Sequence, residues 1–135
     1  MKKNFKNNFI LCGFCGWCIE CFFTGLHSFL CHDKSLACHT SIWMFPIYGL
    51  AALLEPLSRL LRKQCLLVRG SIYTICIYLT EFLTGFVLKK YNACPWDYSS
   101  AKLNYKGIIR LDFAPLWFLT GLLFEKILKK TFYRF

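Results

Sequence analysis

Charged residues are scarce in this 135-residue sequence, and acidic residues are the scarcest. Aspartate and glutamate number only 7 against 17 lysines and arginines, and all charged types make up 18% of the chain. Hydrophobic types make up 56% and aromatics 19%, and the mean hydropathy is positive. A soluble domain of this length would struggle to hide so much apolar surface. The composition therefore argues against a soluble domain and favours a single integral membrane domain over residues 1–135.

Several functional motifs are also missing. The sequence contains neither G-x-x-x-x-G-K-[ST] nor G-x-G-x-x-G, the glycine-rich loops that cradle phosphates. It lacks the G-x-S-x-G elbow of hydrolases as well. The basic residues fall at the ends of apolar segments instead of forming a stripe along a polar helix face, which argues against a nucleic-acid partner. We therefore expect no cofactor and no nucleic acid, and we favour a role other than catalysis.

Nine cysteines are present, but their spacing does not indicate a metal site. Four of them recur at every third residue from Cys12 to Cys21. On a helix, steps of three drift around the axis, so these four thiols cannot converge on one cluster. Thiols inside apolar segments behave as small hydrophobic groups, and the three histidines lack a tight ligand spacing. We expect no metal, and one disulfide stays open among the cysteines in or beside the predicted outward loops, Cys31, Cys38 and Cys94.

Long apolar runs dominate the remainder of the chain. Four segments of roughly 17 to 23 residues can each span a ~30 Å hydrocarbon core as a helix, at ~1.5 Å per residue. Within lipid the backbone must satisfy its own hydrogen bonds, which favours helices over open strands. The sequence therefore predicts an all-α membrane protein with four transmembrane helices at about residues 9–30, 43–61, 66–88 and 112–128.

The lysines and arginines predict how these helices are oriented. With the N-terminus inside, eleven of them fall on the cytoplasmic side and six on the outer side. Because cytoplasmic loops carry the excess of positive charge, both termini are expected in the cytoplasm. The expected localisation is integral and multi-pass, in the cell membrane if the protein is bacterial. The outer loop 89–111 is too aromatic for a solvated linker, and we expect it to pack against the helices or at the membrane interface.

A weak internal repeat relates the two halves of the sequence. Glu20 is followed by a Thr-Gly pair at residues 24–25, and Glu81 by a Thr-Gly pair at residues 84–85. Two tandem helical hairpins, related by an axis along the membrane normal, would account for this pattern. Chance similarity among apolar helices would account for it equally well.

Four glutamates lie inside the apolar segments, where an ionisable group costs ~3 kcal/mol on insertion scales. Glu55 and Glu125 each have a basic residue one turn later, and such pairs need no special function. Glu20 and Glu81 have no basic residue within one turn. Each therefore needs a partner from another helix or a bound proton. Such a carboxyl either links helices by hydrogen bonding or forms a site for a cation, a proton or a polar substrate.

Residues 95–99, Pro-Trp-Asp-Tyr-Ser, form the densest polar and aromatic cluster. Asp97 in this cluster suits a turn in which side chains bind backbone donors, and it could instead face a lipid headgroup or a substrate. Trp96 and Tyr98 lie near the ends of apolar segments, as aromatic anchors at the membrane interface do.

The same cluster carries a resemblance to a known family. The strings concerned are Gly16-Trp17-Cys18-Ile19-Glu20, Thr40-Ser41-Ile42-Trp43, Ile47-Tyr48-Gly49, Glu81-Phe82-Leu83-Thr84-Gly85-Phe86, Asn92-Ala93-Cys94-Pro95-Trp96-Asp97-Tyr98-Ser99 and Gly107-Ile108-Ile109-Arg110-Leu111. They resemble the transmembrane protein 229 family, which is similar in turn to bacterial membrane proteins termed putative ABC-transporter type IV, or CmpB-like. The sequence departs from the family pattern at residues 36–39, which puts a role of the first outer loop in doubt.

The resemblance implies a multi-pass membrane protein over about residues 16–135. It carries over Glu20, Glu81, Trp96, Asp97 and Tyr98 as candidate functional positions, and Thr84 is added because it lies close to Glu81. The expected ion- or substrate-binding residues are therefore Glu20, Glu81, Thr84, Trp96, Asp97 and Tyr98.

Three functions follow from these expectations. The favoured one is a transport-related, permease-like subunit that binds a cation or small polar solute at Glu20 and Glu81. It would act as a homo-oligomer or beside a separate ATPase subunit, because four helices without an ATPase domain cannot form a complete transporter. The second is a non-catalytic membrane scaffold. The third, less favoured, is a lipid-modifying membrane enzyme that uses Asp97 or Glu81.

Overall fold

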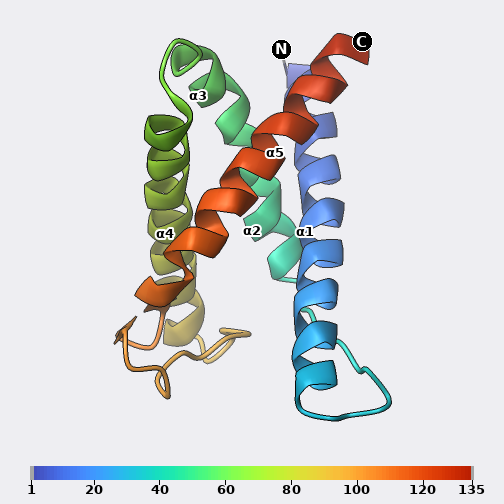
Figure 1. The fold of residues 1–135 in the computed structure, drawn as a ribbon, viewed down its shortest axis with the longest axis vertical. Coiled ribbons are helices and arrows are strands. Elements are labelled where there is room, and N and C mark those ends of the chain that lie inside the picture. Colours follow the sequence, from blue (N-terminus) through green and yellow to red (C-terminus); the bar gives the residue numbers. More distant parts are fainter. Residues whose placement is uncertain (1, 135) are drawn as a thin grey trace. The chain divides into compact units, whose positions relative to one another are not determined.

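The computed structural model describes the backbone of residues 2–134 and the side chains of residues 5–129. The chain divides into a first unit, Met1–Ala52, and a second unit, Leu53–Phe135. Most of the described residues are helical, as the long apolar runs predict, and Figure 1 shows how the helices follow one another along the chain.

The first unit pairs the long helix α1, Lys2–Leu30, with the short helix α2, Met44–Gly49. Glycines let the two helices approach closely. A Cβ atom on Gly13 would lie 2.7 Å from the ring of Phe45, and one on Gly16 would lie 2.0 Å from the side chain of Tyr48. Only a residue without a side chain fits beneath these rings, which is how small residues bring helices together in membrane proteins.

The segment between α1 and α2 folds back along α1, as Figure 1 shows at the end of the blue helix. Side chains of α1 bind its backbone at three levels. Trp17 Nε1 donates to the carbonyl of Ser41 at 3.0 Å. The amide of His39 donates to Thr24 Oγ1 at 2.8 Å, and Ser28 Oγ donates to the carbonyl of Ala37 at 2.6 Å. These bonds satisfy backbone groups of a segment that has no regular structure of its own.

The single helix expected over residues 43–61 is wrong. The structure has three short pieces there: α2, the 3₁₀ helix η1, Leu50–Leu53, and α3, Leu54–Leu60. Pro56 explains the break, because its ring clashes with the carbonyl four residues earlier and it has no N–H to donate to it. The turn before Pro56 tightens into a 3₁₀ helix, which is a common solution at such a site.

The second unit is built on α4, Leu66–Lys90, and α5, Ala114–Arg134, preceded by the 3₁₀ helix η2, Leu111–Phe113. Helix α5 runs obliquely across α4 (Figure 1). Their interface again places a glycine against an aromatic side chain, since a Cβ on Gly121 would lie 2.6 Å from the Cβ of Tyr73. Tyr73, Phe124 and Leu128 are almost completely buried and form the core of this unit.

The segment after α4 contains two short strands, which the expectation of an all-α fold did not include, although the described chain is mostly helical. Strand β1, Asn104–Tyr105, pairs antiparallel with β2, Ile109–Arg110. Gly107 has a φ of +68°, which glycine adopts without strain, and its amide donates to Asn104 Oδ1 at 3.0 Å. A hairpin of this length shows little of the alternating pattern by which strands are recognised in a sequence.

Two of the described helices are long and apolar enough to cross a membrane, Phe5–Leu30 and Leu66–Lys90. Only 17% of each apolar window is buried, whereas the core helix of a soluble protein would be mostly covered. Large apolar side chains such as Phe22 and Leu67 lie on the exposed surface of these helices. An extensive exposed apolar surface of this kind fits contact with lipid.

Candidate functional site

Glu81 lies in α4, half-buried, beneath the segment that follows this helix. The hydroxyl of Tyr98 donates to Glu81 Oε1 at 3.2 Å. Tyr98 is held in place because its amide donates to the carbonyl of Gly107 at 2.9 Å, and its ring meets the edge of Phe113 at 5.6 Å between centroids. Two residues expected at the site, one from a helix and one from a loop, are therefore in contact.

Trp96 anchors the loop that carries Tyr98. Its Nε1 donates to the carbonyl of Ile108 at 2.8 Å. Its ring also packs over Gly85, where a Cβ would lie 2.9 Å away. Because Gly85 is one turn beyond Glu81, Trp96 fixes the loop next to the carboxyl group. The N–H group of Trp96 is thus engaged within the protein.

Asp97 forms a local turn, as its sequence context suggests. Its Oδ1 accepts the amide of Ser99 at 3.0 Å, and this bond lowers the pKa of the Asp97 carboxyl below its ordinary value. Lys89 Nζ lies 3.8 Å from the same oxygen. The side chain of Asp97 is 66% exposed. The structure therefore places Asp97 at the surface of the loop, where it stabilises a turn.

Thr84 is on α4 near Glu81, but its hydroxyl serves its own helix. Thr84 Oγ1 donates to the carbonyl of Thr80 at 2.7 Å, four residues earlier. Such bonds are common for threonine in helices and need no ligand. Thr84 therefore lies close to Glu81 in the sequence, but its hydroxyl donates to the backbone of its own helix and not to the Glu81 carboxyl group.

Three further residues surround Glu81 and Tyr98, and sequence reasoning did not select them. The hydroxyl of Tyr78, one turn before Glu81, donates to the carbonyl of Arg110 at 2.9 Å. The Arg110 guanidinium lies 4.6 Å from the centroid of the Phe113 ring, a cation–π arrangement. We call Glu81, Tyr78, Tyr98, Arg110 and Phe113 the Glu81 cluster. The signal available in the sequence was the polar and aromatic run Arg110–Phe113 just before α5, but its contact with α4 is long-range.

Arg110 is itself balanced by an acid. Its Nε donates to both carboxylate oxygens of Asp112, at 2.7 Å and 2.9 Å. The cation of the Glu81 cluster, Arg110, therefore lies over an aromatic ring and is also paired with the carboxylate of Asp112. This geometry is the one by which proteins recognise cationic groups.

Glu20 finds its partner in the first unit. The side chain of Tyr48, in α2, hydrogen-bonds the Glu20 carboxyl. Tyr48 also lies over Gly16, one turn before Glu20 on α1. Glu20 and Glu81 belong to different units, so they are described as two separate sites, and each pairs with a tyrosine from another element of its own unit.

The two glutamates with a basic neighbour form the expected ion pairs, and this prediction is confirmed. Arg59 lies 2.6 Å from Glu55, and Lys129 lies 2.5 Å from Glu125. Glu125 also has a second basic partner, which the sequence did not predict. Arg69 Nη1 in α4 donates to the same oxygen of Glu125 at 3.0 Å. A hairpin places the start of α4 opposite the later part of α5, and this geometry was the signal that could have revealed the contact.

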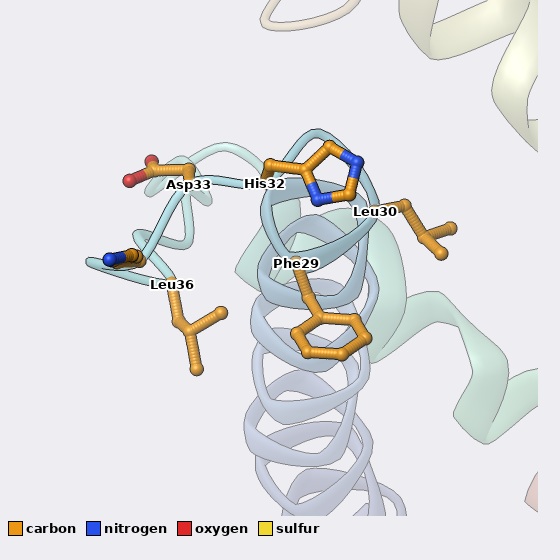
Figure 2. A pocket seen from close by; sticks show the side chains of 6 residues that line it. Phe29, Leu30, His32, Asp33 and Leu36 are labelled. Atoms are coloured by element: carbon orange, nitrogen blue, oxygen red, sulfur yellow. The ribbon is translucent and has the colours of Figure 1, made fainter.

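No group of three metal-ligating side chains occurs among the described residues. Figure 2 shows a pocket of about 450 Å³ at the end of α1, in the first unit. Phe29, Leu30 and Leu36 supply its apolar lining, together with the polar side chains of the turn. None of the expected site residues lines this pocket, and its open, largely apolar lining provides no converging polar groups of the kind that fix a ligand.

The sequence model of one protein family matches residues 7–135, nearly the whole chain, and its description is Putative ABC-transporter type IV. The chain belongs to this family. Membership in the ABC-transporter type IV family agrees with the two exposed apolar helices and indicates a transport-related membrane protein. No solved structure matches the chain.

Proposed function

We propose that the chain is a multi-pass, transport-related membrane subunit that recognises a cation or small polar solute at the Glu81 cluster. The observation that carries this proposal is the contact between Glu81 and Tyr98. It joins an acidic residue of an apolar helix to a polar and aromatic loop at the end of that helix. Ionisable groups within membrane-spanning segments usually line substrate or ion pathways.

The chemistry of the cluster suits a cation better than an anion. Glu81 supplies negative charge, and the hydroxyl of Tyr98 orients it by donating a hydrogen bond. The face of Phe113 already receives a guanidinium group from Arg110. A solute cation that approached Glu81 would meet its carboxyl group together with the side chain of Tyr98.

The broken helix after α1 supports a second recognition point at Glu20. Tyr48, the partner of Glu20, lies in α2 directly before the 3₁₀ segment η1. Transporters place substrate sites at such interrupted helices, because the freed backbone groups face the protein interior or water. We include Glu20 and Tyr48 in the proposal on this ground.

The wider arrangement also belongs to the proposal. We propose four crossings, with residues 43–61 and 112–128 crossing beside α1 and α4, both termini in the cytoplasm, and two tandem hairpins. The outer loop 89–111 would then lie at the outer interface, and the chain would act in a homo-oligomer or with a separate ATPase subunit. We also propose that the chain is a member of the transmembrane protein 229 family. The match to the Putative ABC-transporter type IV family supports the association with an ATPase subunit, and the excess of lysine and arginine on the inner side supports the orientation.

A non-catalytic scaffold is the second candidate, and one observation favours it. Both glutamates hydrogen-bond a tyrosine from a neighbouring element, as residues that only lock helices together would do. Asp97 is held in a turn by Ser99, so the structure adds no support for the lipid-modifying enzyme.

Flux measurements separate transport from a packing role. Purified protein in liposomes, with any co-purified ATPase retained, would be tested for flux of protons, sodium and tetramethylammonium. Glu81→Gln keeps the shape of the side chain, so we expect the variant to keep its thermal stability and to lose flux. Glu55→Gln, in the ion pair with Arg59 on α3, is the matched control and should keep flux. Full flux in Glu81→Gln would favour the scaffold. Affinity purification that recovers no ATPase would refute the proposed association with an ATPase subunit.

A further inference from the structure

Cys21 and Cys38 lie side by side in the first unit, although 17 positions separate them in the sequence. Cys38 is in the segment that folds back along α1. Its Cβ lies 3.7 Å from the point where Gly25 would carry a Cβ atom. Cys21 is one turn before Gly25 on the same face of α1, since residues four apart on a helix lie one above the other. The two thiols are in hydrogen-bonding contact.

The backbone around Cys38 is fixed on both sides. The amide of His39 binds Thr24 Oγ1 at 2.8 Å. The carbonyl of Ala37 accepts from Ser28 Oγ at 2.6 Å. These bonds hold Cys38 against α1 at the level of Gly25, so the approach of the two thiols follows from the course of the backbone and does not depend on a mobile side chain.

We propose that Cys21 and Cys38 form an intramolecular disulfide. This site differs from the disulfide left open by the sequence, which involved Cys31, Cys38 and Cys94. Cys31 instead contacts His27 on its own helix, with 3.7 Å between Sγ and Nε2. Cys21 was expected to act only as a small hydrophobic residue, because its contact with Cys38 is invisible without the fold of the segment between them.

The bond would form by exchange with a low-molecular-weight disulfide such as oxidised glutathione. The Cys38 thiolate, which is the more exposed of the two, attacks one glutathione sulfur and releases a glutathione thiolate. Cys21 then loses its proton and attacks Sγ of Cys38, which releases the second glutathione thiolate. The two protein thiols are oxidised, and the two electrons and two protons end on two molecules of reduced glutathione. The disulfide would link the segment between α1 and α2 covalently to α1. This proposal does not depend on the proposed transport function.

Peptide mapping of the full-length protein in detergent tests the proposal directly. The protein is incubated with oxidised glutathione, its remaining thiols are blocked with N-ethylmaleimide, and it is digested with trypsin. Cleavage after Lys34 separates the peptide 7–34, which contains Cys21, from the peptide 35–59, in which Cys38 is the sole cysteine. We expect these two peptides to remain linked until a reductant is added.

Serine variants assign the linkage to one pair. The linked species should disappear in Cys21→Ser and in Cys38→Ser, and it should persist in the matched controls Cys18→Ser and Cys31→Ser. Circular dichroism of each variant checks that α1 is still formed. Wild-type protein that yields only separately blocked peptides would overturn the proposal, and so would a linked species that survives in a helical Cys21→Ser variant.

Discussion

Breaking the ion pair between Arg69 and Glu125 is predicted to destabilise the second unit strongly. The Glu125 side chain is only 6% exposed and that of Arg69 only 19%, so both charges are largely removed from solvent. Removal of one partner from a buried pair typically costs 3–5 kcal/mol, because the other charge is left without compensation. Lys129 still contacts Glu125 at 2.5 Å, but its side chain is 45% exposed and compensates only in part. We therefore expect Arg69→Met to lower the free energy of unfolding by about 3 kcal/mol.

The control for this variant is the more exposed pair on α3. The side chain of Arg59 is 58% exposed and that of Glu55 is 18% exposed, so both are more accessible than Glu125. Exposed i,i+4 pairs contribute about 0.3–0.5 kcal/mol, so Arg59→Met should change stability very little. A second variant, Arg69→Met with Glu125→Gln, removes the buried negative charge and should recover most of the loss.

The assay is reversible unfolding in mixed micelles with increasing dodecyl sulfate, followed by circular dichroism. It gives the midpoint and the free energy of unfolding for wild type, Arg69→Met, the double variant and the Arg59→Met control. Equal midpoints for Arg69→Met and Arg59→Met would refute the reasoning, since the buried and exposed pairs would then be equivalent. A double variant less stable than Arg69→Met would refute the assignment of the loss to an uncompensated carboxylate.

Two further predictions concern packing and pH. Gly121→Ala should lower the free energy of unfolding by roughly 1–3 kcal/mol in the same assay, because overpacking of this kind forces helices apart. The new Cβ would lie 2.6 Å from the Cβ of Tyr73. Gly25→Ala is the control and should have a much smaller effect, because the atom nearest to its new Cβ would be 3.7 Å away. The pKa of Asp97 is lowered by the amide of Ser99, so the turn should be intact above the ordinary aspartate range and be lost as the pH falls through the lowered pKa. Nuclear magnetic resonance should show the Ser99 amide shifting with that titration, whereas an equal shift in Asp97→Asn would contradict the assignment.

The parts of the fold that depend on local sequence could be predicted. The apolar segments 9–30 and 66–88 lie within α1 and α4, because length and continuous hydrophobicity suffice to specify such helices. The pair of Glu55 with Arg59 depends only on helical spacing. The turn at Asp97 likewise involves neighbours along the chain.

The features that sequence reasoning missed depend on residues far apart in the chain. In the segment 43–61, the missing N–H group of Pro56 favours a break, whereas the apolar content of the same segment favours a continuous helix. Contacts such as Arg69 with Glu125, or Tyr98 with Glu81, become visible only once two elements are placed together. The same holds for the glycine and aromatic contacts between helices, since a glycine in an apolar run does not reveal which ring it accommodates.

The most direct test of the account is whether a cation changes the state of the Glu81 carboxyl group. Difference infrared spectroscopy of the reconstituted protein, with and without sodium or tetramethylammonium, reports carboxylate stretching vibrations. The account predicts a cation-induced shift of a carboxylate band that persists in Glu55→Gln and is absent in Glu81→Gln. An unchanged spectrum in wild-type protein, or an identical shift in folded Glu81→Gln, would contradict cation recognition at the Glu81 cluster.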